Sequence, residues 1–214
     1  MQDIIIVCAG NYAKEIYAVI SKANRIADEK HTERPYRLLG FIDDHPDALD
    51  GTGIPEPILG SIVDWRPIGD EKYAMGTGSP AGKVKLAKML KERGCRFISI
   101  IAPYAIVSPD LVMGEGCVIE AYRVGCGVVL GDFVNVNGSL LMSGAHIDSF
   151  STATGFTVVE NAYVGKRVYL GSHAVVADGV SVGDDASISV GSIVTKDVPA
   201  GATVFGVPAE NVGW

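Results

Sequence analysis

The sequence lacks the marks of a disulfide-bonded, membrane-inserted or secreted protein. Its four cysteines form no Cys-x-x-Cys pair and are too sparse for a disulfide scaffold, which favours a reducing compartment. No segment approaches the roughly 18 consecutive apolar residues of a membrane-spanning helix, so we expect no membrane insertion. The first residues lack a basic stretch and a small-residue cleavage site, so we expect no signal peptide and a cytoplasmic protein.

Basic residues are scarce in the second half of the chain. Residues 101–214 hold 4 Lys+Arg against 11 Asp+Glu, whereas residues 1–100 hold 14 of each, so the net charge of −7 lies entirely in the second half. Nucleic-acid binding needs a basic surface, and we therefore expect no nucleic-acid partner. His146 and His173 are the only two histidines in this half. A zinc site with three histidine ligands is not available there, and we expect no metal.

The composition divides the chain near residue 100. The first half has 4 valines and the second has 22, and valine favours strands because its branched side chain fits a pleated surface. In the first half, short apolar strands at 4–7, 38–42, 72–75 and 96–101 alternate with helical patterns at 12–23 and 83–93. This alternation predicts a small α/β, Rossmann-like domain over residues 1–100, with a β domain over residues 101–214.

The second half repeats every six residues. The longest unbroken series of apolar positions at this spacing is Val164, Leu170, Val176, Val182, Ile188 and Val194. A period of six is typical of a parallel β-helix with three flat sides, in which 18 residues make one coil. Shorter series that include Leu130 and Met142 are out of phase with this one, so we expect the main irregularity of the repeat in Ser143–Thr157.

Several motifs together resemble the bacterial hexapeptide-repeat sugar acyltransferases, the group of sialic-acid O-acetyltransferases and UDP-4-amino-sugar N-acetyltransferases. The motifs are the opening Ile-Ile-Val-Cys-Ala-Gly, Gly-Phe-Ile-Asp-Asp at 40–44, Ile-Leu-Gly-Ser at 58–61, the hexad array, and the ending Val-Thr-Lys-Asp-Val-Pro-Ala-Gly at 194–201 with Gly-Val-Pro-Ala at 206–209. The resemblance implies a left-handed β-helix, a homotrimer with active sites between neighbouring subunits, and acetyl-CoA as co-substrate lying along the β-helix. It also implies a nucleotide-linked amino sugar that reaches in from the N-terminal domain.

Three loops follow the strands expected in the first half. The carboxyl ends of parallel strands meet at one edge of a sheet, where ligands of such sheets bind. The first loop has only one of the three glycines of a dinucleotide fingerprint, and Cys8 and Ala13 would obstruct its tight turn and the close helix–strand packing. Through the resemblance this loop is expected to meet the nucleotide. The candidate substrate-binding residues of the three loops are Gly10, Asn11, Tyr12, Asp43, Asp44, Gly76, Thr77 and Gly78. For the Asp43–Asp44 pair, an ordinary turn and cap is an equally good interpretation.

Acetyl transfer to an amine needs a group that removes the proton of the ammonium, and histidine is the natural group at neutral pH. His146 is our candidate because it lies in the irregular segment, with Asp148 to orient it. It lies two to four residues beyond the position that the resemblance implies. We expect the backbone near Glu160 and Asn161 to hold the developing oxyanion. Candidates for contacts with coenzyme A are Glu160, Asn161, Gly165, Lys166, Arg167 and Lys196.

Alternatives stay open at this point. The same fold and site would suit O-acetylation of a sugar hydroxyl or acylation of a free amino acid such as serine. Because the histidine is out of register, a sugar-nucleotide-binding protein without enzymatic activity is a further alternative.

Overall fold

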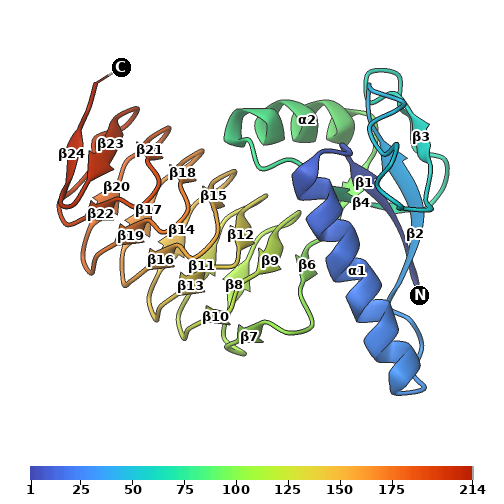
Figure 1. Ribbon diagram of the computed structural model, residues 1–214, viewed down its shortest axis with the longest axis horizontal. Coiled ribbons are helices and arrows are strands. Elements are labelled where there is room, and N and C mark those ends of the chain that lie inside the picture. Colours follow the sequence, from blue (N-terminus) through green and yellow to red (C-terminus); the bar gives the residue numbers. More distant parts are fainter. Residues whose placement is uncertain (214) are drawn as a thin grey trace.

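The first part of the molecule is a five-stranded parallel sheet with two helices. The computed structural model describes residues 1–213, and Figure 1 shows this sheet beside an elongated solenoid that ends at the C-terminus. The strand order is β3-β2-β1-β4-β5. The strands are β1 (Gln2–Val7), β2 (Tyr36–Ile42), β3 (Ile58–Gly60), β4 (Lys72–Met75) and β5 (Arg96–Phe97), and the helices are α1 (Asn11–Glu29) and α2 (Pro80–Glu92).

The central strand β1 explains the layering of this part. Its residues Ile4–Val7 are completely buried. Side chains alternate across a strand, so Ile4 and Ile6 pack in one apolar cluster with the buried face of α1, while Ile5 and Val7 pack in another with α2. The two helices therefore cover opposite faces of the sheet. Helix α1 is longer than the segment predicted from the sequence, 12–23.

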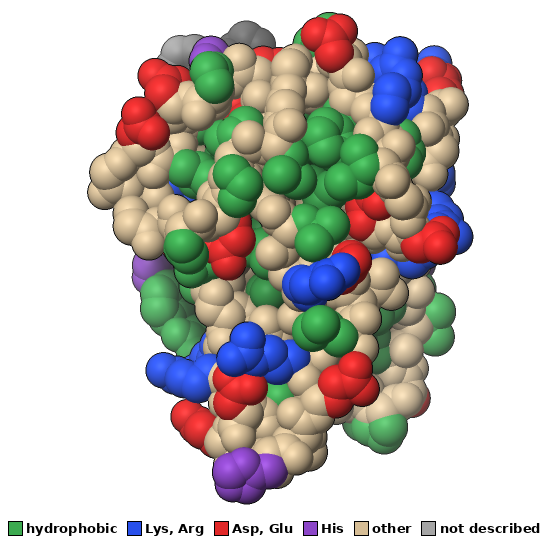
Figure 2. All heavy atoms as spheres, turned by 90° about the vertical axis from the view of Figure 1, so that its right-hand side faces the viewer, with side chains coloured by type: hydrophobic (Ala, Val, Ile, Leu, Met, Phe, Trp, Pro, Cys, Tyr) green, Lys and Arg blue, Asp and Glu red, His purple; other side chains and the backbone are tan. Residues whose placement is uncertain are grey.

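The surface of the N-terminal part carries mixed charge. In Figure 2, which faces this side of the molecule, Lys and Arg side chains are interspersed with Asp and Glu, and neither sign forms a continuous patch. This matches the equal numbers of acidic and basic residues in the first half. No helix within residues 1–213 is long and apolar enough to cross a membrane.

The second part is a parallel β-solenoid with three faces, which matches the expected left-handed β-helix. The chain passes from a first face to a second and a third, and then returns to the first. Inward-pointing residues such as Ile119, Leu130 and Val136 form one continuous apolar core. Each coil buries its apolar side chains against the coils above and below, which is why a repeat of this kind is stable only as a stack.

Successive strands of the solenoid belong to its three faces in turn. The first face holds β6 (Ile100–Ile101), β9 (Val118–Glu120), β12 (Asn135–Asn137), β15 (Thr152–Ala153), β18 (Tyr169–Leu170), β21 (Ser187–Ile188), β23 (Thr203–Gly206) and the antiparallel β24 (Ala209–Asn211). The second holds β7 (Ile106–Val107), β10 (Arg123–Val124), β13 (Leu140–Leu141), β16 (Val158–Val159), β19 (Val175–Val176) and β22 (Ile193–Val194). The third holds β8 (Val112–Met113), β11 (Val129–Leu130), β14 (His146–Ile147), β17 (Tyr163–Val164) and β20 (Ser181–Val182).

The expectation of an irregular segment at Ser143–Thr157 was wrong. The strands β14 and β15 in this segment pair in register with the coils on both sides. The phase of the repeat changes because some sides of the solenoid are five residues long instead of six. Val136 and Leu141, for example, both point inward. Met142, which the six-residue spacing placed in the core, is therefore exposed.

The two parts are joined by a buried lysine. Lys83 of α2 is fully buried. Its ammonium donates hydrogen bonds of 2.8 Å to the carbonyl oxygens of Phe133 and Ser151 and to the hydroxyl of Thr152 in the solenoid. An ammonium has three donors and no acceptor, so all its hydrogen-bonding capacity is used. The contact holds α2, and the loop before it, against the first face.

The single strand predicted at 96–101 is two strands. Arg96–Phe97 is the edge strand β5 of the N-terminal sheet, and Ile100–Ile101 is the first strand of the solenoid, β6. The change of partner occurs at Ile98–Ser99. The sequence does not reveal this change, because Ser99 is the only polar residue between Phe97 and Ile101.

Candidate functional site

A cleft of about 600 Å³ lies between the N-terminal part and the first face of the solenoid. Its wall consists mainly of hydroxyl and amide side chains, with one carboxylate and no lysine or arginine among its lining residues. The lining residues are Asn11, Tyr12, Glu15, Gly78, Ser79, Asn137, Thr152, Thr154, Gly155, Tyr169 and Ser172. We call this space the cleft. Such a wall suits a ligand rich in hydroxyl groups.

The N-terminus of α1 opens into this cleft. Gly10 is the N-cap residue, and no side chain caps the helix. The first N–H groups of a helix have no partner within the helix and carry partial positive charge, which favours a negatively charged ligand. Asn11 and Tyr12, in the first turn, line the cleft.

Cys8 does not prevent the tight turn after β1. Its backbone takes a φ of 72°, in the left-handed region that glycine favours. Strain of this kind costs about 1–3 kcal/mol and persists only where the surrounding contacts enforce it. The expected obstruction by Ala13 was also wrong, since Ala13 is buried in the apolar cluster beneath α1.

Asp43 and Asp44 lie in the loop after β2 and are occupied by contacts within the protein. The carboxylate of Asp43 accepts hydrogen bonds from the N–H groups of Ala9, at 2.7 Å, and His45. That of Asp44 accepts from the hydroxyl of Ser61 and the N–H of Val63, and the hydrogen bond from Ser61 is the main reason why its pKa is lowered. Neither residue lines the cleft. Asp43 thus fixes the loop that leads into α1.

The third loop contributes two glycines with different roles. A Cβ atom on Gly76 would lie 2.4 Å from the carbonyl oxygen of Val7 and 2.8 Å from the Cβ of Ala13, so this glycine permits close packing of strand and helix. A Cβ on Gly78 would meet nothing within 4 Å, and Gly78 lines the cleft. Between them, the carbonyl of Thr77 accepts a hydrogen bond from Asn135 of the solenoid.

His146 lies on the third face, away from the cleft. It lines a shallow pocket of about 260 Å³ together with Gly144, Asn161 and Tyr163, and its ring lies 4.9 Å from that of Tyr163 between centroids. The cleft is built on the first face instead. One protomer therefore does not bring His146 together with the loops of the N-terminal part.

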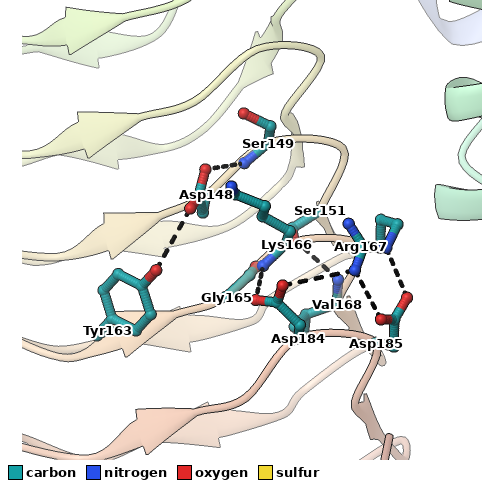
Figure 3. Close-up of polar contacts among 10 residues, drawn as sticks. All are labelled: Asp148, Ser149, Ser151, Tyr163, Gly165, Lys166, Arg167, Val168, Asp184 and Asp185. Carbon is teal, nitrogen blue, oxygen red and sulfur yellow. Dashed lines mark hydrogen bonds and ion pairs between the residues drawn. The ribbon is translucent and has the colours of Figure 1, made fainter. Parts of the chain in front are cut away.

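Asp148 does not orient His146 in the way expected from the sequence. Its carboxylate accepts hydrogen bonds from the N–H of Ser149 and the hydroxyl of Tyr163 (Figure 3), and none from His146. Burial opposes ionisation of Asp148, but the hydrogen bonds from Ser149 and the charge of Lys166 outweigh it, so its pKa is lowered. A connection to His146 runs only through Tyr163, which contacts both residues.

The residues expected to meet coenzyme A lie in different surroundings. Arg167 forms a two-pronged ion pair with Asp185 and a further one with Asp184 (Figure 3). Lys166 and Lys196 are exposed, and neither side chain forms an ion pair within residues 1–213. Gly165 is buried, and a Cβ there would lie 2.6 Å from a carboxylate oxygen of Asp184. Asn161 lines the pocket of His146, whereas the carboxylate of neighbouring Glu160 accepts from the N–H of Asp178.

Sequence reasoning missed one polar group near the cleft, Glu120. It ends β9 on the first face and pairs with Asn137, which lines the cleft. Only 7% of its surface is exposed, and its Oε1 atom has no hydrogen-bond partner. The sequence offers no clear signal for it, because acidic residues also follow the inward-pointing Ile147 and Val159, at Asp148 and Glu160.

Comparisons with known proteins agree with this architecture. No protein-family model matches the chain. Over 49 residues, 23% of this chain and 24% of the relative, it is 45% identical to galactoside O-acetyltransferase of Escherichia coli. Over 132 residues, 61% of this chain and 44% of the relative, it is 30% identical to serine acetyltransferase of Buchnera aphidicola. The chain thus spans less than half the length of these two curated relatives.

Several solved structures match the whole chain, among them the following two. A mutant of GDP-perosamine N-acetyl transferase from Caulobacter crescentus, in complex with CoA and GDP-perosamine, has a TM-score of 0.85 at 22% identity, covering 100% of this chain and 98% of that one. The acetyltransferase domain of PglB from Neisseria gonorrhoeae, in complex with acetyl coenzyme A, has a TM-score of 0.81 at 23% identity, covering 99% of both chains. At these identities the likeness establishes the fold. Together with the curated relatives, it confirms the resemblance to hexapeptide-repeat acetyltransferases.

Proposed function

We propose that the protein is an acetyltransferase that moves the acetyl group of acetyl-CoA to the amino group of a nucleotide-linked amino sugar. Residues 1–100 would serve as a Rossmann-like nucleotide-sugar-binding domain and residues 101–214 as the acyltransferase domain. The cleft is the observation that carries this proposal, because it joins an uncapped helix N-terminus to a wall of hydroxyl and amide groups. The first suits phosphates and the second suits a sugar.

The similar proteins support the proposal. The two curated relatives and the two matching structures are all acetyltransferases, and one of these structures holds CoA and GDP-perosamine while the other holds acetyl coenzyme A. This supports the acyltransferase class and acetyl-CoA as the co-substrate. The absence of lysine and arginine from the cleft further suits a sugar that carries an amine.

The proposed reaction is direct transfer. His146 takes a proton from the ammonium of the sugar, and the free amine attacks the carbonyl carbon of the thioester. A carbon–nitrogen bond forms, the carbon–sulfur bond breaks, and the thiolate of coenzyme A leaves and takes up the second proton of the nitrogen. Backbone N–H groups near Glu160 and Asn161 hold the oxyanion. Lys166 and Lys196 are the free cations for the phosphates of coenzyme A.

Because His146 and the cleft lie on different faces, the proposal includes a homotrimer in the cytoplasm. In it, the cleft of one protomer presents the sugar to the histidine face of its neighbour. Asp43 and Gly76 would act by shaping the loops, while Asn11, Tyr12 and Gly78 line the cleft and would meet the ligand. Gly10 and Thr77 precede these residues in the two loops. Asp44 anchors the loop after β2 to Ser61.

The test is an assay of thiol release. Purified protein is mixed with acetyl-CoA and a panel of UDP-, dTDP- and GDP-linked amino sugars, and release above a blank without acceptor is expected for at least one sugar. His146→Ala is expected to lower turnover by about 100-fold or more if the histidine is the base. Unchanged turnover in this variant would remove His146 from the mechanism, and no release by the wild type across the panel would defeat the proposal.

A second candidate is transfer to a hydroxyl group. The matches to galactoside O-acetyltransferase and serine acetyltransferase favour it, since the acceptors in these two names, a galactoside and serine, both carry hydroxyl groups. Adding galactosides and free serine to the same panel separates the two candidates. A protein that binds nucleotide sugars tightly and releases no thiol with any acceptor would be a binding module instead.

A further inference from the structure

Glu120 and Tyr12 each carry one buried oxygen atom without a hydrogen-bond partner at the same wall of the cleft. The Oε1 atom of Glu120 and the hydroxyl of Tyr12 are both inaccessible to solvent and form no hydrogen bond. Tyr12 lines the cleft directly, and Glu120 pairs with Asn137, which also lines it. Buried polar atoms are nearly always paired, because each unpaired one costs free energy. Two unpaired oxygen atoms buried behind one wall leave this side of the cleft with negative character that no donor compensates.

The surroundings of Glu120 are acidic and phenolic. From α1, Tyr12 and Glu15 face it, and from the loop after β6, Tyr104 does, with a hydrogen-bonding interaction that favours the carboxylate. On α1, the ammonium of Lys22 lies over the ring of Tyr104, 4.6 Å from its centroid. Burial, together with the charge of Glu15, raises the pKa of Glu120 to about 7. The carboxylate thus loses its proton in the neutral range, without a cationic side chain to compensate it.

We infer that Glu120, with Tyr12 and Glu15, recognises the acceptor's amino group as an ammonium ion and so makes the cleft selective for amines over hydroxyls. An ammonium placed against this wall would meet the carboxylate of Glu15, which lines the cleft beside Tyr12, and it would neutralise the charge of Glu120 behind them. A hydroxyl in the same place brings no charge and leaves the buried carboxylate uncompensated. Glu120 is therefore a specificity-determining residue, and it acts through the electrostatic field at the wall. The inference rests on the proposed function for the identity of the ligand.

The test is a measurement of binding, so that it does not depend on turnover. Isothermal titration calorimetry compares the amino sugar that is turned over best in the panel with the same nucleotide sugar bearing a hydroxyl in place of the amine. If the panel shows no turnover, UDP-linked 4-amino sugar and its 4-hydroxy counterpart are the probes. The proteins are the wild type, Glu120→Gln, Glu15→Gln and, as a matched control, Glu92→Gln at the exposed far end of α2.

The wild type and the control should bind the amine about tenfold to a hundredfold more tightly than the hydroxyl compound, as expected for a charged hydrogen-bonding partner. Glu120→Gln should lose most of this ratio while its affinity for the hydroxyl compound stays the same. The wild type's preference should also weaken as the pH falls from about 8 to about 6, because Glu120 takes up a proton. Glu15→Gln should move the midpoint of this change to lower pH, since the charge of Glu15 holds the pKa of Glu120 up.

Two outcomes would overturn the inference. In the first, the wild type and Glu120→Gln prefer the amine to the same extent. In the second, the preference of both proteins changes with pH in the same way, which would show that the titrating group is the ligand's own amine. Circular dichroism of each variant verifies that it folds. If Glu120→Gln does not fold, the pH dependence of Glu15→Gln, a substitution at an accessible position, still tests the inference. A loss of thiol release with the preference intact would reject the proposed function and leave this inference standing.

Discussion

At the scale of single residues, the buried carboxylate of Glu120 should destabilise the ligand-free protein. A carboxyl group whose pKa rises from 4.5 to about 7 on folding binds its proton more tightly in the folded state. Stability therefore falls as the pH rises from about 4.5 to about 7, and the loss is complete above that range. Because one pKa unit corresponds to about 1.4 kcal/mol, Glu120→Gln should stabilise the ligand-free protein by about 2–3 kcal/mol at pH about 8 and by little at pH about 4.5.

Chemical denaturation of the wild type and Glu120→Gln at both pH values measures this difference. The exposed variant Glu92→Gln serves as the control, and its stability should follow that of the wild type at each pH. A gain of equal size at both pH values would show that the stabilisation comes from packing instead of ionisation. A buried group that destabilises the free protein is typical of a residue kept for binding.

The two glycines of the third loop give a second prediction at this scale. Gly76→Ala should destabilise the protein by about 2 kcal/mol or more, because the added methyl would overlap the Val7 carbonyl oxygen and Ala13. Gly78→Ala has open space around the new methyl and should fold with unchanged stability. Its effect should be weaker binding of the nucleotide sugar, since the methyl extends toward the cleft. Thermal unfolding and calorimetry separate the two; equal destabilisation of both variants would contradict this assignment.

The sequence predicts that residues in the loops after the strands lie close together, but it does not predict which polar side chains are buried. Asn11, Tyr12 and Gly78 line the cleft as expected because loops after parallel strands converge at one edge. Glu120 was missed because its importance comes from a lack of partners, which depends on how α1 packs against the solenoid. His146 was selected for its chemistry, and the sequence does not reveal that its strand belongs to the third face.

At the scale of secondary-structure elements, α2 should depend on Lys83 for its attachment to the solenoid. Lys83→Met would remove the donor to the buried carbonyl of Phe133, one of the two donors to the carbonyl of Ser151, and the donor to the hydroxyl of Thr152. We expect a loss of about 3 kcal/mol or more. Lys85→Met, exposed on the same helix, is the matched control and should change stability by less than about 0.5 kcal/mol.

Urea unfolding measures the loss of stability, and hydrogen exchange shows where it acts. In Lys83→Met, amide protons of α2 should exchange faster than those of α1, because only α2 loses its attachment. Equal stability of the lysine variants, or faster exchange spread evenly over both helices, would show that α2 is held by the other contacts. These are the apolar packing and the hydrogen bonds from the solenoid to the loop before α2.

The periodicity of the elements was predictable, but its phase was not. A six-residue spacing from Val164 to Val194 identifies the solenoid, since each inward position must be apolar. Where a side of the coil shortens to five residues, the next apolar residue simply comes one place earlier. Leu141 and Met142 are both apolar, so the sequence does not show which one points inward; the pairing of Leu141 with Val124 and Val159 decides it.

At the scale of the whole molecule, the proposed reaction needs more than one protomer. The cleft and His146 lie on different faces of the solenoid, so a single chain holds two half-sites that face apart. One corner of the solenoid, between its first and second faces, also carries stacked side chains that remain exposed. The rings of Tyr122, Phe156 and His173 follow one another at centroid distances of 5.8 and 5.1 Å, and more than half of the surface of Tyr122 and Phe156 is exposed.

Such a row of exposed aromatic side chains is suited to contact with a neighbouring protomer. We therefore expect the wild type to have about three times the protomer mass of 22.5 kDa in light scattering coupled to size-exclusion chromatography. Phe156→Asp should yield monomers, because a charge cannot be buried at the contact without a partner. Phe156 has a φ of 61°, a conformation that aspartate tolerates better than most residues, so the variant's own fold should persist.

The decisive comparison is between mass and turnover in the same samples. Monomeric Phe156→Asp should still bind the nucleotide sugar, because the cleft lies within one chain, yet it should release no thiol, because the histidine face comes from a neighbour. Ile68→Asp, which places the same charge on an exposed residue of the N-terminal part, should remain trimeric and active. If monomers retained full turnover, the reaction would be complete within one chain, and a residue near the cleft would have to replace His146 as the base.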